Sequence, residues 1–331
     1  MGGCVAGGTS RRARFLLAVL AVGGLVGVPL AGATSPGRDG RIAYARKDPA
    51  GHWQVWVASA RLSGAKRLTN GRADSGWPVW SPDGKKIAFD SSRTDPAPGD
   101  SKHINDVFVM KADGSKVRKL TGSKGASADA AWSPDGSHIA FDADRGHYPA
   151  RQGIYVMDAS GRNLRRVTRL PAHYANDLAP RFSPNGKRLV FTRYRGTGRA
   201  EKAALFTVPL DGTRLHRLTS FSIHAGDADW SPDGTRIVFE AYPSPNSYGD
   251  VYVVSARGGH PVNLTRNPVG QAGSADPVWS PDGHKILFLD NRRVNGIART
   301  GLATIKPDGS ARHFISGTNV EAHQPDWESI H

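Results

Sequence analysis

The chain is organised around one repeated pentapeptide. Trp-Ser-Pro-Asp-Gly occurs at residues 80–84, 132–136, 230–234 and 279–283. Phe-Ser-Pro-Asn-Gly replaces it at 182–186, and Pro-Asp-Trp at 325–327 is a truncated last copy. The aromatic residues of successive copies are 52, 50, 48, 49 and 48 positions apart. A sustained period of about 50 residues is typical of repeat architectures, in which each copy forms one supersecondary unit.

Each copy continues with the same short apolar runs. Ile-Ala-Phe follows the turn at 87–89 and 139–141, Asp-Val-Phe-Val-Met comes at 106–110, and Leu-Thr ends the copy at 120–121. The runs are rich in β-branched and aromatic residues and are bounded by turn residues, so they predict β-strands. No segment after residue 33 shows a helical period.

Turn chemistry explains the most repeated residues. In Ser-Pro-Asp-Gly, proline fixes φ at the second turn position and glycine can adopt φ > 0. Asn185 replaces the aspartate in one copy, which favours a structural role over a catalytic or metal-binding one. The aromatic residues are expected to pack between neighbouring sheets. The residues interpreted as structural are Trp80, Pro82, Asp83, Gly84, Trp132, Pro134, Asp135, Gly136, Phe182, Trp230, Pro232, Asp233, Gly234, Trp279, Pro281, Asp282, Gly283 and Trp327.

Four short strands in about 50 residues describe one blade of a β-propeller. We name them A, which ends at the Trp-Ser, and then B, C and D in chain order. The repeats begin with a B strand at 41–44 and finish with a lone A strand near 324–327. Pairing this last strand with the first blade would close a ring. The sequence therefore predicts an all-β fold, a six-bladed β-propeller of four-stranded blades over residues 41–331.

These tandem units resemble the WD40-like (PD40) repeats of the TolB family, over about residues 41–327. The resemblance implies a non-catalytic scaffold that mediates protein–protein or envelope interactions. TolB proteins of the Tol-Pal system also carry an α/β domain before the propeller, for which residues 34–40 leave no room, so a Tol-Pal role does not follow. The sequence contains no Gly-x-Ser-x-Gly, His-Glu-x-x-His or nucleotide-binding glycine loop.

Residues 1–33 have the features of an export signal. Arg11, Arg12 and Arg14 precede an apolar run at 15–30, and the small residues at 31–33 suit cleavage before Thr34. The arginines are similar to a twin-arginine signal, although the general export route and a retained membrane anchor remain alternatives. After cleavage, a short linker at 34–40 would lead into the propeller at 41–331, with no membrane-spanning segment. We therefore expect a periplasmic or extracellular protein.

Net charge and cysteine content limit the partners. Lysine and arginine number 44 against 29 aspartates and glutamates, giving +15, and loss of three arginines with the signal leaves +12. An anionic polymer is therefore a candidate partner beside a protein partner. Nucleic acid is disfavoured, because the basic residues are scattered and the chain is exported. The single cysteine, Cys4, leaves with the signal, and we expect a monomer without disulfides.

The B–C and D–A connections share one face of the predicted ring and vary in sequence, which is typical of binding loops. One candidate site is basic. Its residues are Arg193, Tyr194, Arg195, Arg199, Arg292 and Arg293. Arginines with an interleaved tyrosine suit phosphate, carboxylate or sugar ligands. The alternative is a solvated rim that keeps the protein soluble.

A second candidate site is the channel mouth. Its residues are Asp74, Asp129, Asp177, His224, Asp227, Asp276, Glu321 and His323. No cofactor is expected by default, but carboxylates gathered there would suit a hard cation such as calcium. Such a site would also suit a lyase- or hydrolase-type enzyme, which is the alternative to a scaffold. The competing interpretation is that the acidic side chains only hydrogen-bond the strand ends.

Overall fold

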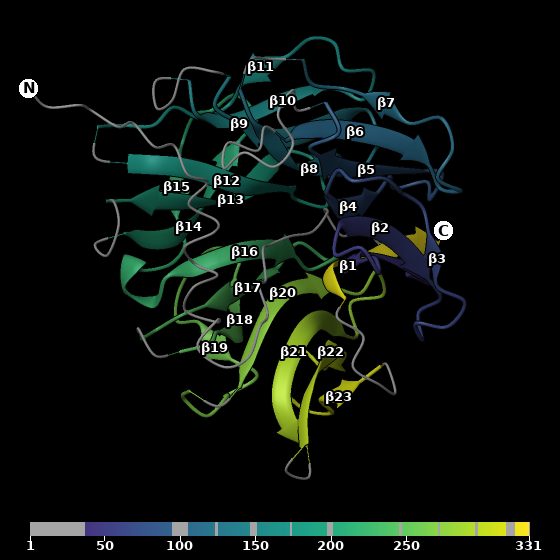
Figure 1. Cartoon of the computed structure of the whole chain (residues 1–331). Helices are drawn as coiled ribbons and strands as arrows, with labels where there is room; N and C mark the ends of the chain where they lie inside the picture. Colours follow the sequence, from purple (N-terminus) through teal and green to yellow (C-terminus); the bar gives the residue numbers. More distant parts are fainter. Residues whose placement is uncertain are drawn as a thin grey trace, which may run out of the picture.

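The structure is a computed structural model, and it describes residues 37–94, 105–122, 125–145, 151–172, 174–196, 201–244, 247–270, 272–294, 297–315 and 322–330. They form six four-stranded sheets arranged around a central axis (Figure 1). The six-bladed β-propeller predicted from the repeats is therefore confirmed. The predicted signal at 1–33 lies outside the described residues. Among those that are described, no helix is long and apolar enough to cross a membrane.

The first three blades are built as follows, from the innermost strand outward. Blade 1 contains β24 (His323–Ile330), β1 (Arg38–Lys47), β2 (Trp53–Ala58) and β3 (Lys66–Arg67). Blade 2 contains β4 (Ser75–Trp80), β5 (Lys86–Ser91), β6 (Asp106–Lys111) and β7 (Arg118–Lys119). Blade 3 contains β8 (Ser127–Trp132), β9 (His138–Ala143), β10 (Gly153–Asp158) and β11 (Arg165–Arg166).

The last three blades repeat this order. Blade 4 contains β12 (Tyr174–Phe182), β13 (Arg188–Arg195), β14 (Lys202–Pro209) and β15 (His216–Arg217). The 3-10 helix η2 (Phe221–Ile223) precedes blade 5, which contains β16 (Ala225–Trp230), β17 (Arg236–Ala241), β18 (Asp250–Ser255) and β19 (Val262–Asn263). Blade 6 contains β20 (Gly273–Trp279), β21 (Ile286–Val294), β22 (Ile297–Ile305) and β23 (His313–Phe314).

Blade 1 closes the ring with strands from both ends of the chain. β24 pairs antiparallel with β1, with Ile42 opposite Trp327 and Arg38 opposite Ile330. Arg41 adds a two-pronged ion pair, because its Nε and Nη2 donate to the carboxylate of Glu328 at 2.8 and 2.7 Å. The pairing begins at Arg38, three residues before the start expected from the repeats. Closure leaves β1 without the free edge on which another chain could pair.

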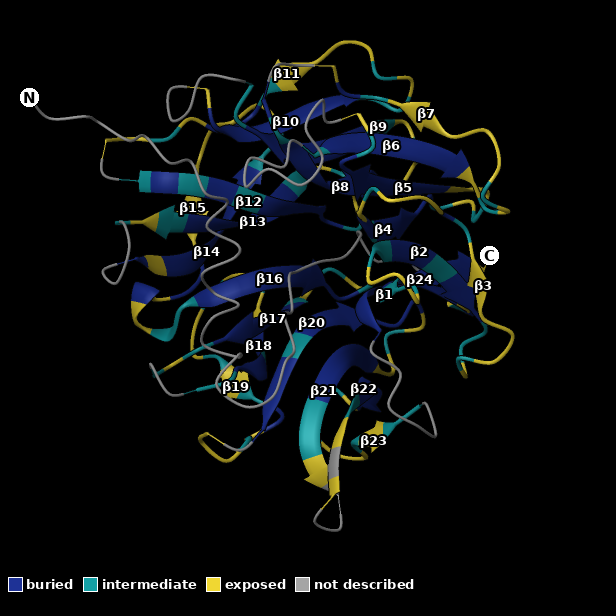
Figure 2. Ribbon diagram, viewed as in Figure 1, coloured by how far each residue is buried: buried dark blue, intermediate teal, exposed yellow. Residues whose placement is uncertain are grey.

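The hydrophobic core lies between neighbouring blades. In one cluster, Val79 and Val107 of blade 2 pack with Trp132 and Phe141 of blade 3. Other buried residues of blade 3, such as Ile139 and Met157, belong to the same cluster. Trp132 is 3% exposed, and burying such a side chain stabilises the fold by about 2–3 kcal/mol. The repeated aromatic residues therefore pack between sheets, and Figure 2 shows the strands near the axis as almost wholly buried.

The Ser-Pro-Asp-Gly segments form the short A–B turns. Asp135 accepts hydrogen bonds from the Ser133 hydroxyl at 2.6 Å and the Ser137 amide at 3.0 Å, and Gly136 has φ 69°. These bonds, with the Ser133 hydroxyl first, lower the pKa of Asp135 to about 2. Asn185 accepts the same pair of bonds in blade 4, from Ser183 and the amide of residue 187. The repeated carboxylate thus holds its own turn.

Two B–C segments expected to be loops, 192–203 and 290–300, begin and end as paired strands. β13 runs on to Arg195 and pairs with β14, whose first residue is Lys202. β21 and β22 remain paired out to Val294 and Ile297, so blade 6 projects beyond its neighbours as a long hairpin (Figure 1). The loop prediction was wrong here because alternation of polar and apolar residues stops where a hairpin leaves the core, although its hydrogen bonding continues.

Candidate functional site

A left-handed bulge interrupts the innermost strand of every blade. The residue three positions before the aromatic has φ between 49° and 55° in each copy: Trp77, Asp129, Ala179, Asp227, Asp276 and Gln324. Positive φ costs energy for any residue except glycine, so six such residues in register need an external constraint. The bulge also shifts the register between the first and second strands, as at Ala128 and Ala131.

The constraint is a ring of six hydrogen bonds around the central axis, where the sequence analysis placed the channel mouth. Each bulge amide donates to a side chain of the preceding blade. The bonds are Asp129 N to Asp90 Oδ2 (2.8 Å), Ala179 N to Asp142 Oδ1 (3.3 Å), Asp227 N to Thr192 Oγ1 (3.2 Å), Asp276 N to Glu240 Oε2 (3.1 Å), Gln324 N to Asp276 Oδ2 (3.0 Å) and Trp77 N to Gln324 Oε1 (2.9 Å). The ring crosses the closure at Gln324, so it ties the last strand to blades 6 and 2.

Four of the predicted channel acids, with Asp177 among them at 0% exposure, lie in the innermost strands and are buried. Asp129 and Asp276 are 1% exposed, and Asp227 is 4% exposed. Asp74 is different, since its side chain is 51% exposed and accepts a bond from the Trp53 amide at the surface. Glu321 lies outside the described residues. The channel group predicted from the sequence is therefore only partly assembled in space.

Asp227 and Asp276 form a buried acidic group with Glu240 of β17. Burial raises the pKa of Asp227 well above its usual range, and the Glu240 carboxylate raises it further. Burial and then Glu240 do the same to the pKa of Asp276. The Tyr242 hydroxyl donates to Glu240 at 3.2 Å. Because like charges repel strongly in a low-dielectric site, this group keeps its protons to higher pH than exposed carboxylates do.

The two predicted histidines lie in unlike surroundings. His323 is 1% exposed and meets the Trp53 ring edge-on, with centroids 5.1 Å apart. Burial, with a smaller contribution from Lys47, lowers the pKa of His323 to about 4, so the ring is neutral at neutral pH. His224 caps η2 with φ 48° and is half-buried. Its pKa is lowered by burial and then by Lys202.

A fully buried arginine lies among the channel acids, and the sequence analysis missed it. Arg181 is 0% exposed and stands directly before the aromatic of blade 4, where Asp229 and Asp326 stand in blades 5 and 1. Its Nη1 donates to the Pro180 carbonyl at 2.5 Å, while Nε and Nη2 have no hydrogen-bond partner in the described part of the chain. Burial lowers the pKa of Arg181, and the carboxylate of Asp129 opposes this most strongly, followed by Asp229 and Asp326.

The same arginine bears on the calcium hypothesis. A guanidinium stays charged in proteins, so Arg181 already supplies a cation to these carboxylates. Several of them are also engaged with backbone amides, as Asp229 is with Trp279 at 2.9 Å and Asp326 with Trp80 at 2.7 Å. Among the described residues, no three His, Cys, Asp or Glu side chains are placed to hold a metal ion. The donor set described here does not fit a divalent cation.

Two residues predicted for different sites bind each other. Arg193, from the basic group, forms a two-pronged ion pair with Asp177, from the channel group, at 2.6 and 2.7 Å. Both side chains are almost completely buried, at 3% and 0% exposure. The Asp177 amide in turn donates to Gln152 at 3.0 Å. This pair fastens the first and second strands of blade 4, so neither residue is available to a ligand.

The other basic residues lie on the two long B–C hairpins. Arg195 is exposed and stacks over the Phe221 ring at 4.2 Å, and Tyr194 beside it is half-buried. Arg292 bonds to Asp290 at 2.9 Å, whereas Arg293 is exposed. Arg199 lies outside the described residues. The predicted basic face is therefore divided between blades 4 and 6.

Several residues that shape the site left signals in the sequence. Asp90, Asp142 and Glu240 each follow the phenylalanine of a B strand, and that recurrence of an acid marks the acceptors of the bulge ring. Arg181 stands where the other copies have Val, Ala or Asp, so a lone basic residue at an inner position was visible. Its burial could not be seen, because that depends on ring closure.

Comparison with known proteins identifies the same architecture. The family model described as the TolB beta propeller domain, PD40, matches residues 151–331. The Tol-Pal system protein TolB of Francisella tularensis subsp. mediasiatica is 28% identical over 256 residues, 76% of this chain and 53% of that protein. An uncharacterized peptidase, YuxL, of Bacillus subtilis is 28% identical over 56% of this chain and 25% of its own length. The chain thus spans about half or less of these relatives.

Solved structures show the fold more widely. TolB from Acinetobacter baumannii superposes with a TM-score of 0.67 and 23% identity, covering 88% of this chain and 67% of that one. An oligogalacturonate lyase in complex with manganese gives a TM-score of 0.56 and 13% identity, covering 84% and 73%. At these identities the likeness concerns the fold alone, and the fold is shared by proteins named TolB and by an enzyme named as a lyase.

Proposed function

Because the chain belongs to the PD40 TolB β-propeller family, we propose that it is an exported, monomeric scaffold that binds a protein partner and catalyses no reaction. The relatives named as Tol-Pal system proteins support a role in an assembly. The sequence features of residues 1–33 support export to the periplasm or the extracellular space. The surface we assign to the partner is the face of the B–C and D–A connections.

One observation supports this surface above the others: like charges face each other across both long hairpins. Arg195 is the cross-strand partner of Lys202, and Arg292, whose charge is partly balanced by Asp290, is the partner of Arg299. Directly opposed like charges destabilise an antiparallel pair by a few tenths of a kcal/mol or more. A carboxylate-rich surface docked against the hairpins would remove that cost. We therefore assign an acidic patch to the partner protein.

Site-specific photocrosslinking in intact cells of the native host tests the proposal. A photoreactive residue at Ile297, which is 62% exposed on the blade 6 hairpin, is expected to capture one protein. The same residue at Lys187, exposed in an A–B turn on the opposite face, is the control and should not capture it. Capture from Lys187 alone, or from neither position, would refute the assigned surface.

A charge variant separates contact from proximity. Arg195→Gln with Lys202→Gln removes one opposed pair and should weaken crosslinking at Ile297 several-fold, because the partner loses its counter-charges. Lys85→Gln with Lys187→Gln removes the same charge from the opposite face and should leave the yield unchanged. Equal losses in both variants would mean that net charge, rather than this face, governs the interaction.

An enzyme is the second candidate, favoured by the buried group of Asp227, Glu240 and Asp276. Perturbed pKa values of this kind cluster at catalytic sites. Asp227→Asn is the discriminating variant, because the Asp227 bond in the ring uses its backbone amide rather than its side chain. A lyase or hydrolase activity abolished by this substitution would establish the enzyme. Unchanged partner crosslinking by the same variant would support the scaffold.

We also propose that the scaffold needs no bound divalent cation, since Arg181 balances the channel carboxylates. Thermal unfolding of the purified protein should give the same Tm in EDTA and in millimolar calcium or manganese. A rise in Tm that depends on the concentration of either ion and is lost in Asp229→Asn would show a channel metal site and overturn this part of the proposal.

A further inference from the structure

The outermost segments of four neighbouring blades form a strongly cationic surface. Each C–D turn with its D strand makes one nine-residue segment: 59–67 in blade 1, 111–119 in blade 2, 158–166 in blade 3 and 209–217 in blade 4. Together the four segments hold twelve lysines and arginines against three aspartates. We call them the basic rim. The excess of nine charges is more than half of the +15 of the whole chain.

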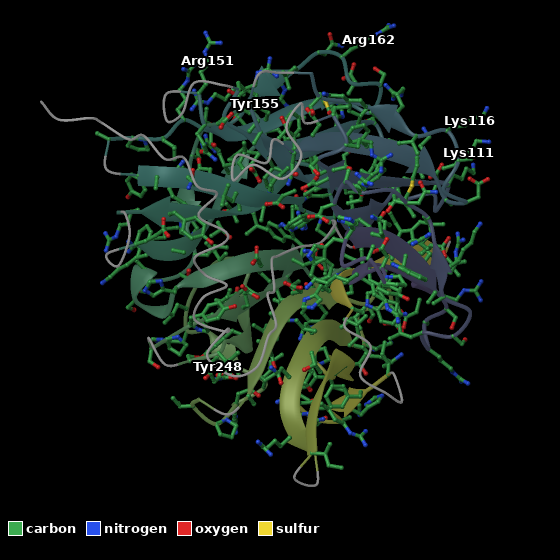
Figure 3. All side chains as sticks on the ribbon, in the orientation of Figure 1. Lys111, Lys116, Arg151, Tyr155, Arg162 and Tyr248 are labelled. Atoms are coloured by element: carbon green, nitrogen blue, oxygen red, sulfur yellow. The ribbon has the colours of Figure 1, made fainter. Side chains whose placement is uncertain are left out.

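The basic rim lies on the outer wall of the propeller. Strands β3, β7 and β11 mark its edge in Figure 1, and Figure 2 shows β3 and β7 as exposed. Lys111, Lys116 and Arg162 project outward from blades 2 and 3 in Figure 3. Eleven of the twelve basic side chains are exposed, and Arg166 is half-buried.

The fold does not require this charge. The equivalent segments 255–263 of blade 5 and 306–314 of blade 6 hold three basic residues and one aspartate. One of the three, Arg312, is turned inward, where its Nε bonds to Asp290 at 3.0 Å and its Nη1 to Asn267 at 3.0 Å. The six segments have the same length and occupy the same place in each blade. The turn of blade 6 also has positive φ at the same two positions as the turns of blades 1–4, so the difference in charge between those blades lies in side chains alone.

Protection of edge strands does not explain the rim either. Lysine on an exposed edge discourages pairing with other chains. The D strands of blades 5 and 6 are equally short edges, yet they carry Val262-Asn263 and His313-Phe314. If edge protection were the reason, these two blades would need it as much as the other four.

The cations of the rim are joined from blade to blade. Lys66 of blade 1 donates to the Asp113 carbonyl of blade 2 at 3.2 Å. Arg118 of blade 2 donates to the Ser160 carbonyl of blade 3 at 2.9 Å, and Arg165 of blade 3 bonds to the Leu210 carbonyl of blade 4. His216 follows at the same position in blade 4, and Val262 in blade 5, so the series of charged bridges ends there. These three bonds use carbonyl acceptors and leave the positive charge uncancelled. Two other rim cations do pair with aspartates outside the segments, Lys119 with Asp106 at 2.6 Å and Arg67 with Asp48 at 3.4 Å.

We propose that the basic rim binds a linear polyanion, a flexible polymer with phosphate or carboxylate groups along its length. In a six-bladed ring, the outermost segments of the first and fourth of four adjacent blades are separated by roughly half the circumference of the wall. A flexible chain can follow that curve and contact every segment, whereas a flat membrane touches a convex wall at one place. Arginine and lysine suit repeated phosphate or carboxylate groups, and neutralising them releases counterions from the polymer.

Binding of inorganic polyphosphate to the purified full-length protein, as a function of salt, tests the proposal. The rim variant is Lys116→Gln, Arg162→Gln and Arg214→Gln, one exposed turn residue from each of blades 2, 3 and 4. We expect its Kd to rise about tenfold near 0.1 M salt, and the slope of log Kd against log salt to fall by two to three, about one per lost contact. If carboxylates also bind, poly-glutamate should bind the parent more tightly than the rim variant, as polyphosphate does.

The matched control is Arg257→Gln, Arg266→Gln and Lys306→Gln, which removes the same charge from exposed positions of blades 5 and 6. The Kd of this control variant for polyphosphate should stay within about twofold of the parent value, since the basic rim is unchanged. Equal weakening in both variants, or no polyphosphate binding by the parent at physiological salt, would overturn the proposal. So would rim-dependent binding to phosphatidylglycerol vesicles that exceeds binding to polyphosphate. Neither variant alters the hairpins assigned to the protein partner, so the two proposals can fail separately.

Discussion

In the channel, acidic side chains are buried and bonded to the backbone of the next blade, whereas on the basic rim cationic side chains stand in solvent. Asp129 is 1% exposed and Asp90 accepts its amide, while Lys116 is an exposed turn residue. Both regions derive from the same repeat. Inner positions are constrained because six bulges must meet around one axis, and a change there affects every blade.

Outer positions are under no such constraint. The C–D segments keep their length in all six blades, and all but blade 5 share one turn geometry, but their charge differs between blades 1–4 and blades 5–6. The fold does not require a charge at these positions. An excess of lysine and arginine there therefore indicates what the surface contacts. The channel side chains therefore mainly stabilise the ring, whereas the rim side chains bear more on which partners bind.

Removing the last strand should have the largest effect. A chain ending at residue 321 lacks β24, which has seven buried residues out of eight, and it loses two bonds of the bulge ring. We expect no cooperative unfolding transition by circular dichroism, because blade 1 loses its innermost strand. Lys66→Ala with Arg67→Ala, in the outermost strand of the same blade, is the control and should unfold cooperatively. A normal melt of the truncated chain would refute closure by β24.

Arg181→Met should have the next largest effect. It leaves the Asp129, Asp229 and Asp326 carboxylates without their buried counter-charge, which costs about 3–5 kcal/mol in comparable buried pairs. Urea denaturation at pH 7 measures the loss. Arg181→Lys keeps the charge and should lose less, and Arg118→Met on the rim should lose under about 1 kcal/mol. Equal losses at Arg181 and Arg118 would contradict the distinction between channel and rim.

The buried His323 should make stability depend on pH. Its folded pKa of about 4 lies below the unfolded value of 6.5, so the unfolded state binds the proton first as pH falls. The free energy of unfolding should therefore decrease between pH 6.5 and 4, by about 3 kcal/mol from this residue. His323→Gln should remove that decrease, whereas His313→Gln, an exposed outer residue, should not. Parallel curves for parent and His323→Gln would disprove the assignment.

The effect of His323 has to be measured as the difference between the stability–pH curves of the parent and of His323→Gln. The buried carboxyls change stability with pH in the opposite direction. The pKa of Asp227 is raised, so the folded state holds its proton longer than the unfolded state. Its contribution to stability is full below the unfolded pKa and is lost as pH rises through the folded pKa. Asp227 is present in both curves, so its contribution cancels.

The smallest effect is expected at the exposed A–B turns. The pKa of Asp135, at about 2, means that its stabilisation is present above pH 4 and is lost as pH falls toward 2. Solvent screening keeps the contribution below about 1 kcal/mol. Asp135→Ala should lower stability at pH 7 by that amount. Asp135→Asn should be nearly neutral, as Asn185 shows in blade 4, and a large loss on that change would assign the carboxylate a further role.

The repeat was enough to predict the fold, but only part of the site. Turn chemistry and the spacing of Trp80 and its counterparts determined the blades, and a lone C-terminal strand predicted the closure. The site depends on contacts between blades, which a one-dimensional pattern does not contain. Arg181 was therefore overlooked among residues that alternate like any strand. Asp177 and Arg193 pair within blade 4, and they were assigned to separate groups because the register that places them opposite each other on β12 and β13 was not known.

The division of blade 1 between the two ends of the chain has a consequence for biogenesis. Arg41 and Glu328 are 287 positions apart, so their contact cannot form until the chain has been synthesised through residue 328. Blades 2 to 6 can assemble in sequence as they emerge, but β1 keeps an unsatisfied edge throughout that time. Completion of the ring is then a late, all-or-none event, and a ribosome that stalls before the last strand releases a chain prone to aggregate.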